Sequence, residues 1–187
     1  MWMLLAIVLP MQAGGGLALW RPRDRRARQN YVVVFACLTS VCALAAVFTL
    51  RGEAPLMVLS LGEKLTIAFH VDGLSCIFAA LVSVLWPLAS LYAVEYMSRE
   101  GAENRFFAFY LISFGVTLGI AFSANVLTMY LFYELLTLAT LPLVMHAMDS
   151  KARYAGRVYL TYSMCGAALG FIAMVMMIEH GSWFFQF

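Results

Sequence analysis

Residues 125–147 read NVLTMYLFYELLTLATLPLVMHA, an apolar run long enough to cross a membrane. The run holds one carboxylate, Glu134, which falls close to its middle. A charged side chain at the bilayer centre costs about 2.5–3.5 kcal/mol on insertion scales, so an acid at this depth needs a reason to be there. Glu134 is therefore the first candidate for a functional group.

The rest of the chain has the same apolar character. Of its 187 residues, 64% are hydrophobic and 12% are charged, whereas about 25% of residues are charged in soluble domains. We predict an all-α integral membrane protein with six transmembrane helices, forming a single membrane domain over residues 1–187. The expected spans are residues 1–20, 31–50, 73–97, 106–122, 125–147 and 158–178. Nucleic-acid binding is not expected, because the basic run 21–28 lies between two apolar segments.

A longer connection separates the second and third spans. Within it, two short apolar runs, residues 57–61 and 65–69, flank the turn 62–64, which begins with Gly62. This pattern predicts a β-hairpin. A lone hairpin is marginal in water, so we expect it to pack on the membrane surface or on a neighbouring subunit.

The basic residues predict the orientation. With six spans, the loops 21–30, 98–105 and 148–157 share one side, and they hold ten of the twelve lysines and arginines. Since basic loops stay in the cytoplasm, these three loops are expected there. The hairpin and both chain termini are then expected outside.

The neighbours of Glu134 support a polar site. Tyr130 and Thr137 lie four residues before it and three residues after it, on the same helix face. Pro142 cannot donate a hydrogen bond to the carbonyl of Leu138, which leaves an acceptor one turn past Glu134. Two interpretations remain: a proton or cation site, or a protonated side chain that joins neighbouring helices.

His146 and two glycines are further candidates. His146 ends the fifth span and could relay protons between Glu134 and the cytoplasm, although its interfacial position favours a histidine without that role. Gly166 and Gly170 in the sixth span have the spacing at which small residues let helices approach closely. They are candidates for helix packing.

The remaining polar residues suggest little chemistry. Asp72, Glu95 and Glu179 fall at span ends, and Glu100, Glu103 and Asp149 are expected to be solvated in loops. The four cysteines lie in apolar runs, where we expect small buried residues without disulfides or zinc. Catalytic residues, metal ligands and cofactors are not predicted.

Three motifs in order resemble those of a known family. They are HVDGLS at 70–75, NRFFAFY at 104–110 and NVLTMYLFYE at 125–134. The chain resembles, over roughly residues 55–180, the antiporter-like, proton-translocating subunits of respiratory complex I, membrane-bound hydrogenases and Mrp-type Na⁺/H⁺ antiporters. The context of Glu134 is nearer to the Mrp-like and hydrogenase-like branches.

The resemblance implies a role for Glu134 and a larger fold. In that family, the matching glutamate pairs with a lysine on a broken seventh helix and gates proton movement, within a fold built on two inverted repeats. This chain stops after its sixth expected span, and no span contains a lysine. The resemblance therefore implies the N-terminal part of such a subunit, either as a fragment or completed by a second polypeptide.

The expected function is proton or Na⁺/H⁺ translocation as part of an antiporter-like subunit. Glu134 would carry the proton, with Tyr130, Thr137 and His146 as relay groups. The expected partners are other membrane subunits, the lipid bilayer, H⁺ and, as a second ion, Na⁺. Any enzymatic role would be that of a translocase subunit in an NADH:quinone oxidoreductase-like or hydrogenase complex of a prokaryotic inner membrane. The alternative is a non-transporting scaffold that packs on partner subunits through the hairpin and the Gly166–Gly170 face.

Overall fold

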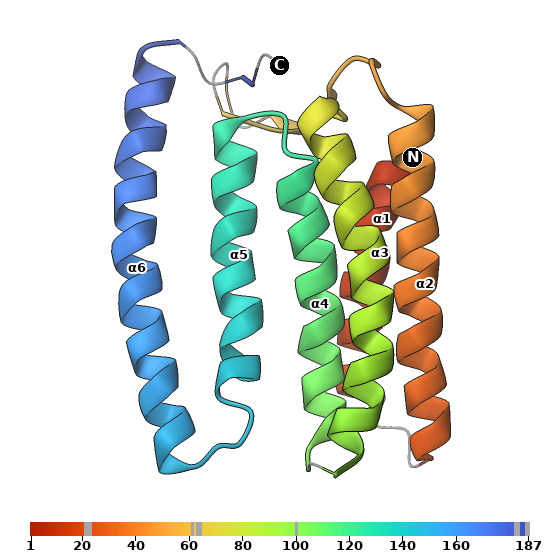
Figure 1. The fold of residues 1–187 in the computed structure, drawn as a ribbon. Coiled ribbons are helices and arrows are strands. Elements are labelled where there is room, and N and C mark those ends of the chain that lie inside the picture. Colours follow the sequence, from red (N-terminus) through yellow and green to blue (C-terminus); the bar gives the residue numbers. More distant parts are fainter. Residues whose placement is uncertain (21–23, 61, 63–64, 100, 182–183, 186–187) are drawn as a thin grey trace.

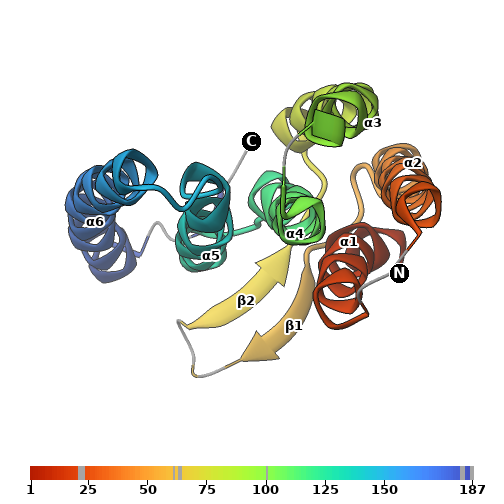
Figure 2. The same ribbon diagram turned by 90° about the horizontal axis from the view of Figure 1, so that it is seen from below.

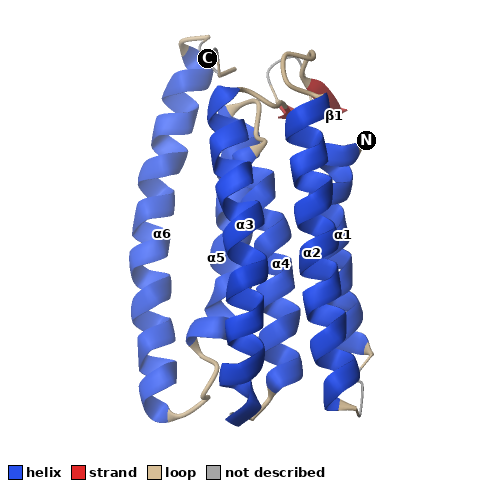
Figure 3. Cartoon of the chain, turned by 45° about the vertical axis from the view of Figure 1, so that its right-hand side comes forward, coloured by secondary structure: helices blue, strands red, loops and turns tan. Residues whose placement is uncertain are grey.

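The computed structural model describes residues 1–20, 24–60, 62, 65–99, 101–181 and 184–185. In chain order, its elements are α1 (Trp2–Leu19), α2 (Arg25–Thr49), β1 (Leu56–Ser60), β2 (Thr66–Phe69), α3 (Gly73–Tyr96), the short 3₁₀ helix η1 (Met97–Arg99), α4 (Glu103–Ala121), α5 (Val126–Val144) and α6 (Ser150–Glu179). The six α-helices are each long and apolar enough to cross a membrane. The predicted fold class, with its small antiparallel sheet between the second and third helices, is confirmed (Figure 3).

The helices run side by side with their ends roughly level (Figure 1). Viewed along their axes, α1 to α4 form a cluster, and α5 and α6 extend from α4 in a row (Figure 2). The hairpin and the described chain ends lie at one end of the bundle (Figure 1). The connections from α1 to α2, α3 to α4 and α5 to α6 lie at the opposite end, which we call the basic end because its loops and first helical turns carry most of the arginines and lysines.

Three helices begin earlier than the apolar spans suggested: α2 at Arg25, α4 at Glu103 and α6 at Ser150. Two of these early starts have side-chain N-caps, because Asp24 accepts from Arg26 N at 3.1 Å and Asp149 accepts from Ala152 N at 2.6 Å. Such a cap satisfies one of the unpaired N–H groups of the first turn. The helical backbone therefore continues through charged residues that a count of apolar residues leaves out.

The hairpin is anchored on the start of α5 through β2. The side-chain amide of Asn125 donates to Thr66 O at 2.7 Å, and its Oδ1 caps α5 by accepting from Thr128 N at 2.8 Å. The Thr128 hydroxyl oxygen in turn accepts from Ala68 N at 3.0 Å. β2 is largely buried by these contacts, while every residue of β1 is exposed. The predicted turn residues Glu63 and Lys64 lie outside the described residues.

Glycines allow the closest helix contact, which is between α1 and α4. A Cβ atom at Gly14 would collide with the backbone oxygen of Ala108, and one at Gly115 would collide with that of Ile7. Because the obstacles are backbone atoms, neither position has room for a side chain. The buried core lies around this contact and includes Leu17, Phe107, Leu111, Phe114 and Leu118.

The cysteines depart from the expectation of burial. Cys42 is buried and Cys76 is partly buried, but Cys37 and Cys165 are exposed. Both exposed thiols lie within the apolar runs of spanning helices. In a membrane protein an apolar run faces either lipid or protein, so the sequence pattern could not distinguish the two environments.

Candidate functional site

Glu134 lies in the middle of α5, partly buried, with its Oε1 atom shielded and without a hydrogen-bond partner among the described residues. Tyr130, one turn earlier on the same helix, has an electrostatic and a side-chain hydrogen-bond interaction with the Glu134 carboxylate, while Oε1 itself stays without a partner. A buried carboxylate oxygen without a partner is costly in an apolar medium. The site therefore has an acceptor that protein groups in the described part of the chain leave open.

Helix α5 packs between two neighbours, α4 and α6. Phe132 lies against α4, where its ring fills the space beside Gly119. Tyr130 and Tyr133 point the other way, to Gly170 and Gly166 of α6. Glu134 follows Tyr133 and lies one turn from Tyr130, so it belongs to the half of α5 that looks toward α6.

Hydroxyl groups continue along this half of α5 toward the basic end. Thr137 is buried, and its hydroxyl donates to Tyr133 O at 3.4 Å. Thr140 donates to Leu136 O at 2.8 Å, and its Oγ1 lies 2.7 Å from the hydroxyl of Tyr159 on α6. We call the contact between α5 and α6 made by Tyr130, Tyr133, Thr140, Tyr159 and the two glycines the α5–α6 seam.

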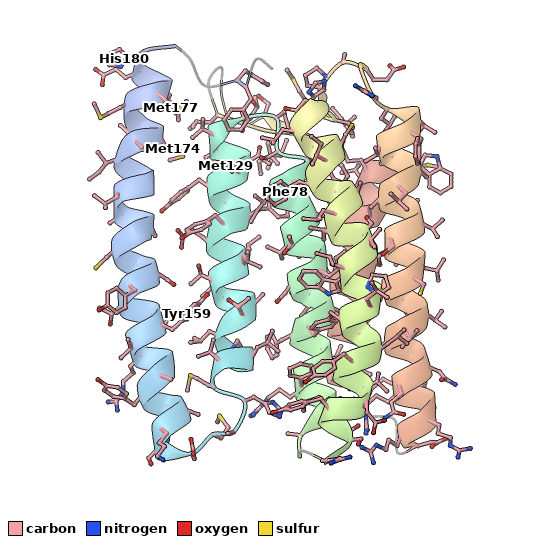
Figure 4. The ribbon with its side chains drawn as sticks, in the orientation of Figure 1. Phe78, Met129, Tyr159, Met174, Met177 and His180 are labelled. Atoms are coloured by element: carbon pink, nitrogen blue, oxygen red, sulfur yellow. The ribbon has the colours of Figure 1, made fainter. Side chains whose placement is uncertain are left out.

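Thr140 and Tyr159 were not among the residues predicted from sequence. Thr140 continues the spacing of Glu134 and Thr137 along α5, which was an available signal. The sequence contained no sign of its partner, because Tyr159 lies at the first apolar turn of α6 among several other tyrosines. Figure 4 shows the Tyr159 side chain between α6 and α5.

His146 lies away from Glu134, just past the end of α5 at the basic end. Its Nε2 is 3.0 Å from Gly101 O, its ring packs edge-on against Phe106, and its backbone oxygen accepts from Arg105 at 2.6 Å. These contacts join α5 to the start of α4. A proton that moved from Glu134 to His146 would need other groups to carry it along the intervening turns of α5.

The predicted packing glycines face tyrosine rings of the same chain. A Cβ atom at Gly166 would lie 3.8 Å from the Tyr133 hydroxyl, and one at Gly170 would lie 3.7 Å from the Tyr130 ring. Both distances are ordinary van der Waals contacts. The two glycines leave room for the rings, and the backbones of α5 and α6 do not come as close there as those of α1 and α4.

Glu103 corrects a prediction, because it is buried rather than solvated in a loop. It starts α4 and forms ion pairs with Arg28 at 2.5 Å and Arg25 at 2.8 Å, both from α2. The next residue, Asn104, donates to Leu17 O of α1 at 2.5 Å, and Arg105 bonds the end of α5. Three consecutive residues thus tie α4 to three different helices. The neighbouring Glu100, also expected to be solvated, lies outside the described residues.

Other kinds of site find no support in the described ranges. No three His, Cys, Asp or Glu side chains gather there in a way that could hold a metal ion. The fold and the site together define a multi-pass membrane protein with one carboxylate held partway along a spanning helix, beside a row of hydroxyl groups.

Comparison with known proteins agrees with this class. Residues 59–107 match the family model described as NADH-ubiquinone oxidoreductase (complex I), chain 5 N-terminus. A probable K⁺/H⁺ antiporter subunit from Rhizobium meliloti is 26% identical over 181 residues, which is 93% of this chain and 18% of that protein. A Na⁺/H⁺ antiporter subunit from Alkalihalophilus pseudofirmus is 38% identical over 82 residues, covering 43% of this chain and 10% of that protein.

Solved structures share the fold. A chain of the Mrp complex from Dietzia sp. superimposes with a TM-score of 0.80 at 16% identity, over 97% of this chain and 20% of that chain. A chain of the membrane-bound sulfane sulfur reductase, an archaeal respiratory membrane complex, gives a TM-score of 0.73 at 13% identity, over 97% and 38%. The predicted resemblance is confirmed: the chain is similar to the N-terminal part of antiporter-like subunits. It spans less than a fifth of the curated relatives named above.

Proposed function

We propose that the chain translocates protons, or exchanges Na⁺ for H⁺, as part of an antiporter-like subunit of a multisubunit membrane complex. The observation that carries this proposal is the Oε1 atom of Glu134, buried on a spanning helix without a hydrogen-bond partner in the described residues. A carboxylate in that position can take up a proton and release it when a cation or water approaches. Tyr130 and Thr137 are proposed as its first relay groups, and His146 as a group at the basic end.

The names of the relatives support this kind of function. They are antiporter subunits for K⁺/H⁺ and Na⁺/H⁺, and the structural neighbours are chains of multisubunit membrane complexes. We therefore propose H⁺ as a transported ion, Na⁺ as a second one, and other membrane subunits as partners. The family match to a complex I chain also supports a place in a redox-driven complex as a translocase subunit.

The charge distribution supports the proposed orientation. The loops at the basic end carry most of the arginines and lysines, so we place this end in the cytoplasm of a prokaryotic cell, beneath the inner membrane. The hairpin and both termini are then outside. Cysteine labelling at position 26 and in the hairpin turn tests this, and labelling of both positions from one side would contradict it.

The alternative of a non-transporting scaffold has one observation in its favour. β1 exposes Leu56, Met57, Val58 and Leu59, an apolar edge that could contact a partner. The other contact proposed for a scaffold, the Gly166–Gly170 face, has less support, because these glycines face Tyr133 and Tyr130 of the same chain. A scaffold also has no need for the carboxylate of Glu134.

The test is ion exchange in inverted membrane vesicles from cells that make the chain within its natural complex. Glu134→Gln keeps the size and hydrogen-bonding capacity of the side chain but cannot titrate, so exchange should be lost while assembly stays normal. Glu95→Gln is the matched control, because Glu95 is an exposed acid on the spanning helix α3. Normal exchange by an assembled Glu134→Gln complex would exclude the proposal and favour the scaffold.

A further inference from the structure

The α5–α6 seam contains one directional contact, the hydrogen bond between Tyr159 and Thr140. The Thr140 hydroxyl already donates to Leu136 O at 2.8 Å, so its oxygen accepts from the Tyr159 hydroxyl at 2.7 Å. The other described contacts between α5 and α6 are apolar: ring packing of Tyr130 on Phe171, with centroids 5.9 Å apart, the tyrosines over Gly166 and Gly170, and Gly156 packed on Met145 and Leu141. Lipid tails can replace such apolar contacts at little cost, whereas they cannot replace a hydrogen bond.

Little of helix α6 is buried against the rest of the described chain, so each of its contacts with α5 matters. Only 11% of its most apolar stretch is buried, compared with 50% for α4. Its described contacts with α5 fall in three regions: the tyrosine–glycine contacts toward the hairpin end, then the Tyr159–Thr140 bond, then Gly156 against Met145 and Leu141 at the basic end. Glu134 lies between the first two regions along α5, on the half of the helix that looks toward α6.

We propose that Tyr159 and Thr140 are positioning residues that hold α6 beside Glu134 and so keep lipid away from its carboxylate. Neither residue needs to touch the proton itself. If the bond breaks, α6 stays attached at the basic end through the 145–149 connection and the packing of Gly156 on Met145. The seam beside Glu134, however, loses the hydrogen bond that sets its spacing, so lipid reaches the carboxylate more often. The importance of this shielding for transport rests on the proposed function of Glu134, but the shielding itself can be measured without transport.

The probe is N,N′-dicyclohexylcarbodiimide, an apolar reagent that enters the bilayer. The O–H of a protonated carboxyl group adds across one of its C=N bonds, and the O-acylisourea that forms rearranges to a stable N-acylurea on the side chain. The purified chain in phosphatidylcholine vesicles is treated with the reagent, and the modified peptide is quantified by mass spectrometry over time. Glu134→Gln gives the blank. Circular dichroism and thermal unfolding of each variant establish that it is folded before its labelling rate is compared.

Tyr159→Phe and Thr140→Val each remove one hydroxyl with little change of shape. We expect each to raise the labelling rate of Glu134 by about threefold, the factor that one interhelical hydrogen bond in a membrane supports. Because both variants break the same bond, the double variant should label no faster than either single variant. Thr140→Ser keeps the hydroxyl that accepts from Tyr159, so Glu134 should be labelled at the wild-type rate in this variant.

Tyr162→Phe is the matched control, since Tyr162 is a tyrosine of the same helix that is 76% exposed. It should leave the labelling of Glu134 unchanged. Equal labelling in wild type, Tyr159→Phe and Thr140→Val would overturn the positioning proposal, even if Glu134→Gln abolishes exchange. Faster labelling in both variants would sustain it, even if Glu134→Gln exchanges normally and the proposed function fails.

Discussion

The contact between α1 and α4 and the contact between α5 and α6 are built in opposite ways. Between α1 and α4, Gly14 and Gly115 bring backbone against backbone, and large apolar side chains close the space around them. Between α5 and α6, tyrosine rings hold the helices apart over Gly166 and Gly170, and a hydrogen bond joins them. The tight positions of the first contact meet backbone atoms, whereas those of the second, including Gly156 beside Met145, meet only side chains.

The two regions therefore suit different tasks. At the basic end, α4 is fixed to α2 through Glu103 and to α1 through Asn104. The candidate proton site lies outside this fixed cluster, on the half of α5 turned away from α4. A carboxylate that must change its protonation or its partner benefits from a neighbour that can move.

The largest effect is expected from removing the carboxylate of Glu103 in the fixed cluster. Glu103→Ala removes a buried carboxylate, and with it the 2.5 Å ion pair to the partly buried Arg28 and the 2.8 Å ion pair to Arg25. We expect a loss of about 3 kcal/mol in the free energy of unfolding, the cost of breaking a buried ion pair from one side. The measurement is the midpoint of unfolding by dodecyl sulfate in mixed micelles. Glu95→Ala, at an exposed acid, should leave the midpoint in place, and equal midpoints for both variants would contradict the prediction.

A somewhat smaller loss is expected when the α1–α4 contact is overfilled. Gly115→Ala forces a methyl group onto Ile7 O and within 2.7 Å of Met11 Cγ, so the helices must separate. We expect a loss of about 2 kcal/mol in the same unfolding assay. Gly15→Ala is the control, because no atom lies within 4 Å of its Cβ position and alanine favours the helix. A tolerated Gly115→Ala would mean that α1 can shift along α4.

Sequence reasoning predicted the elements well, because each depends on local pattern. The six helices follow from apolar runs of spanning length, and the hairpin follows from two short runs around Gly62. Glu134 could be selected because an acid in the middle of such a run stands out. None of these inferences required knowledge of which helices are neighbours.

The contacts between helices could not be predicted in the same way. Glu103 was expected in solvent, since nothing in the sequence brings Arg28 next to it. The spacing of small residues singled out Gly166 and Gly170, but it does not show that α6 faces tyrosine rings while Gly115 faces backbone. Partner choice depends on the direction of each helix face in space, and in lipid both buried and exposed faces are apolar.

The junction between the two regions should give an intermediate effect. Asn125 connects α4 to α5 and is fully buried, where it caps α5 and holds β2. Asn125→Ala removes the hydrogen bonds of the side chain with Thr66 and with Thr128 N, and we expect a loss of about 1 to 2 kcal/mol. Asn125→Asp keeps the capping oxygen but cannot donate to Thr66 O, so it should lose less. Amide hydrogen exchange should show faster exchange at Ala68 in both variants, and unchanged exchange there would contradict the anchoring role.

The smallest effect is expected in the α5–α6 seam, at Gly170. A methyl group at this position would lie 3.7 Å from the Tyr130 ring, which is an ordinary contact, so Gly170→Ala should fit without moving either helix. Alanine also costs less than glycine within a helix, by about 0.5 to 1 kcal/mol, so the variant should unfold at an equal or slightly higher midpoint. The opposite sign is expected from Gly115→Ala, although both changes place the same methyl group on a spanning helix. Measured side by side in the same micelles, the two variants test the comparison directly. A loss above about 1 kcal/mol for Gly170→Ala would mean that the seam closes more tightly in the bilayer, so that α6 would be fixed as firmly as α1 and could not open beside Glu134.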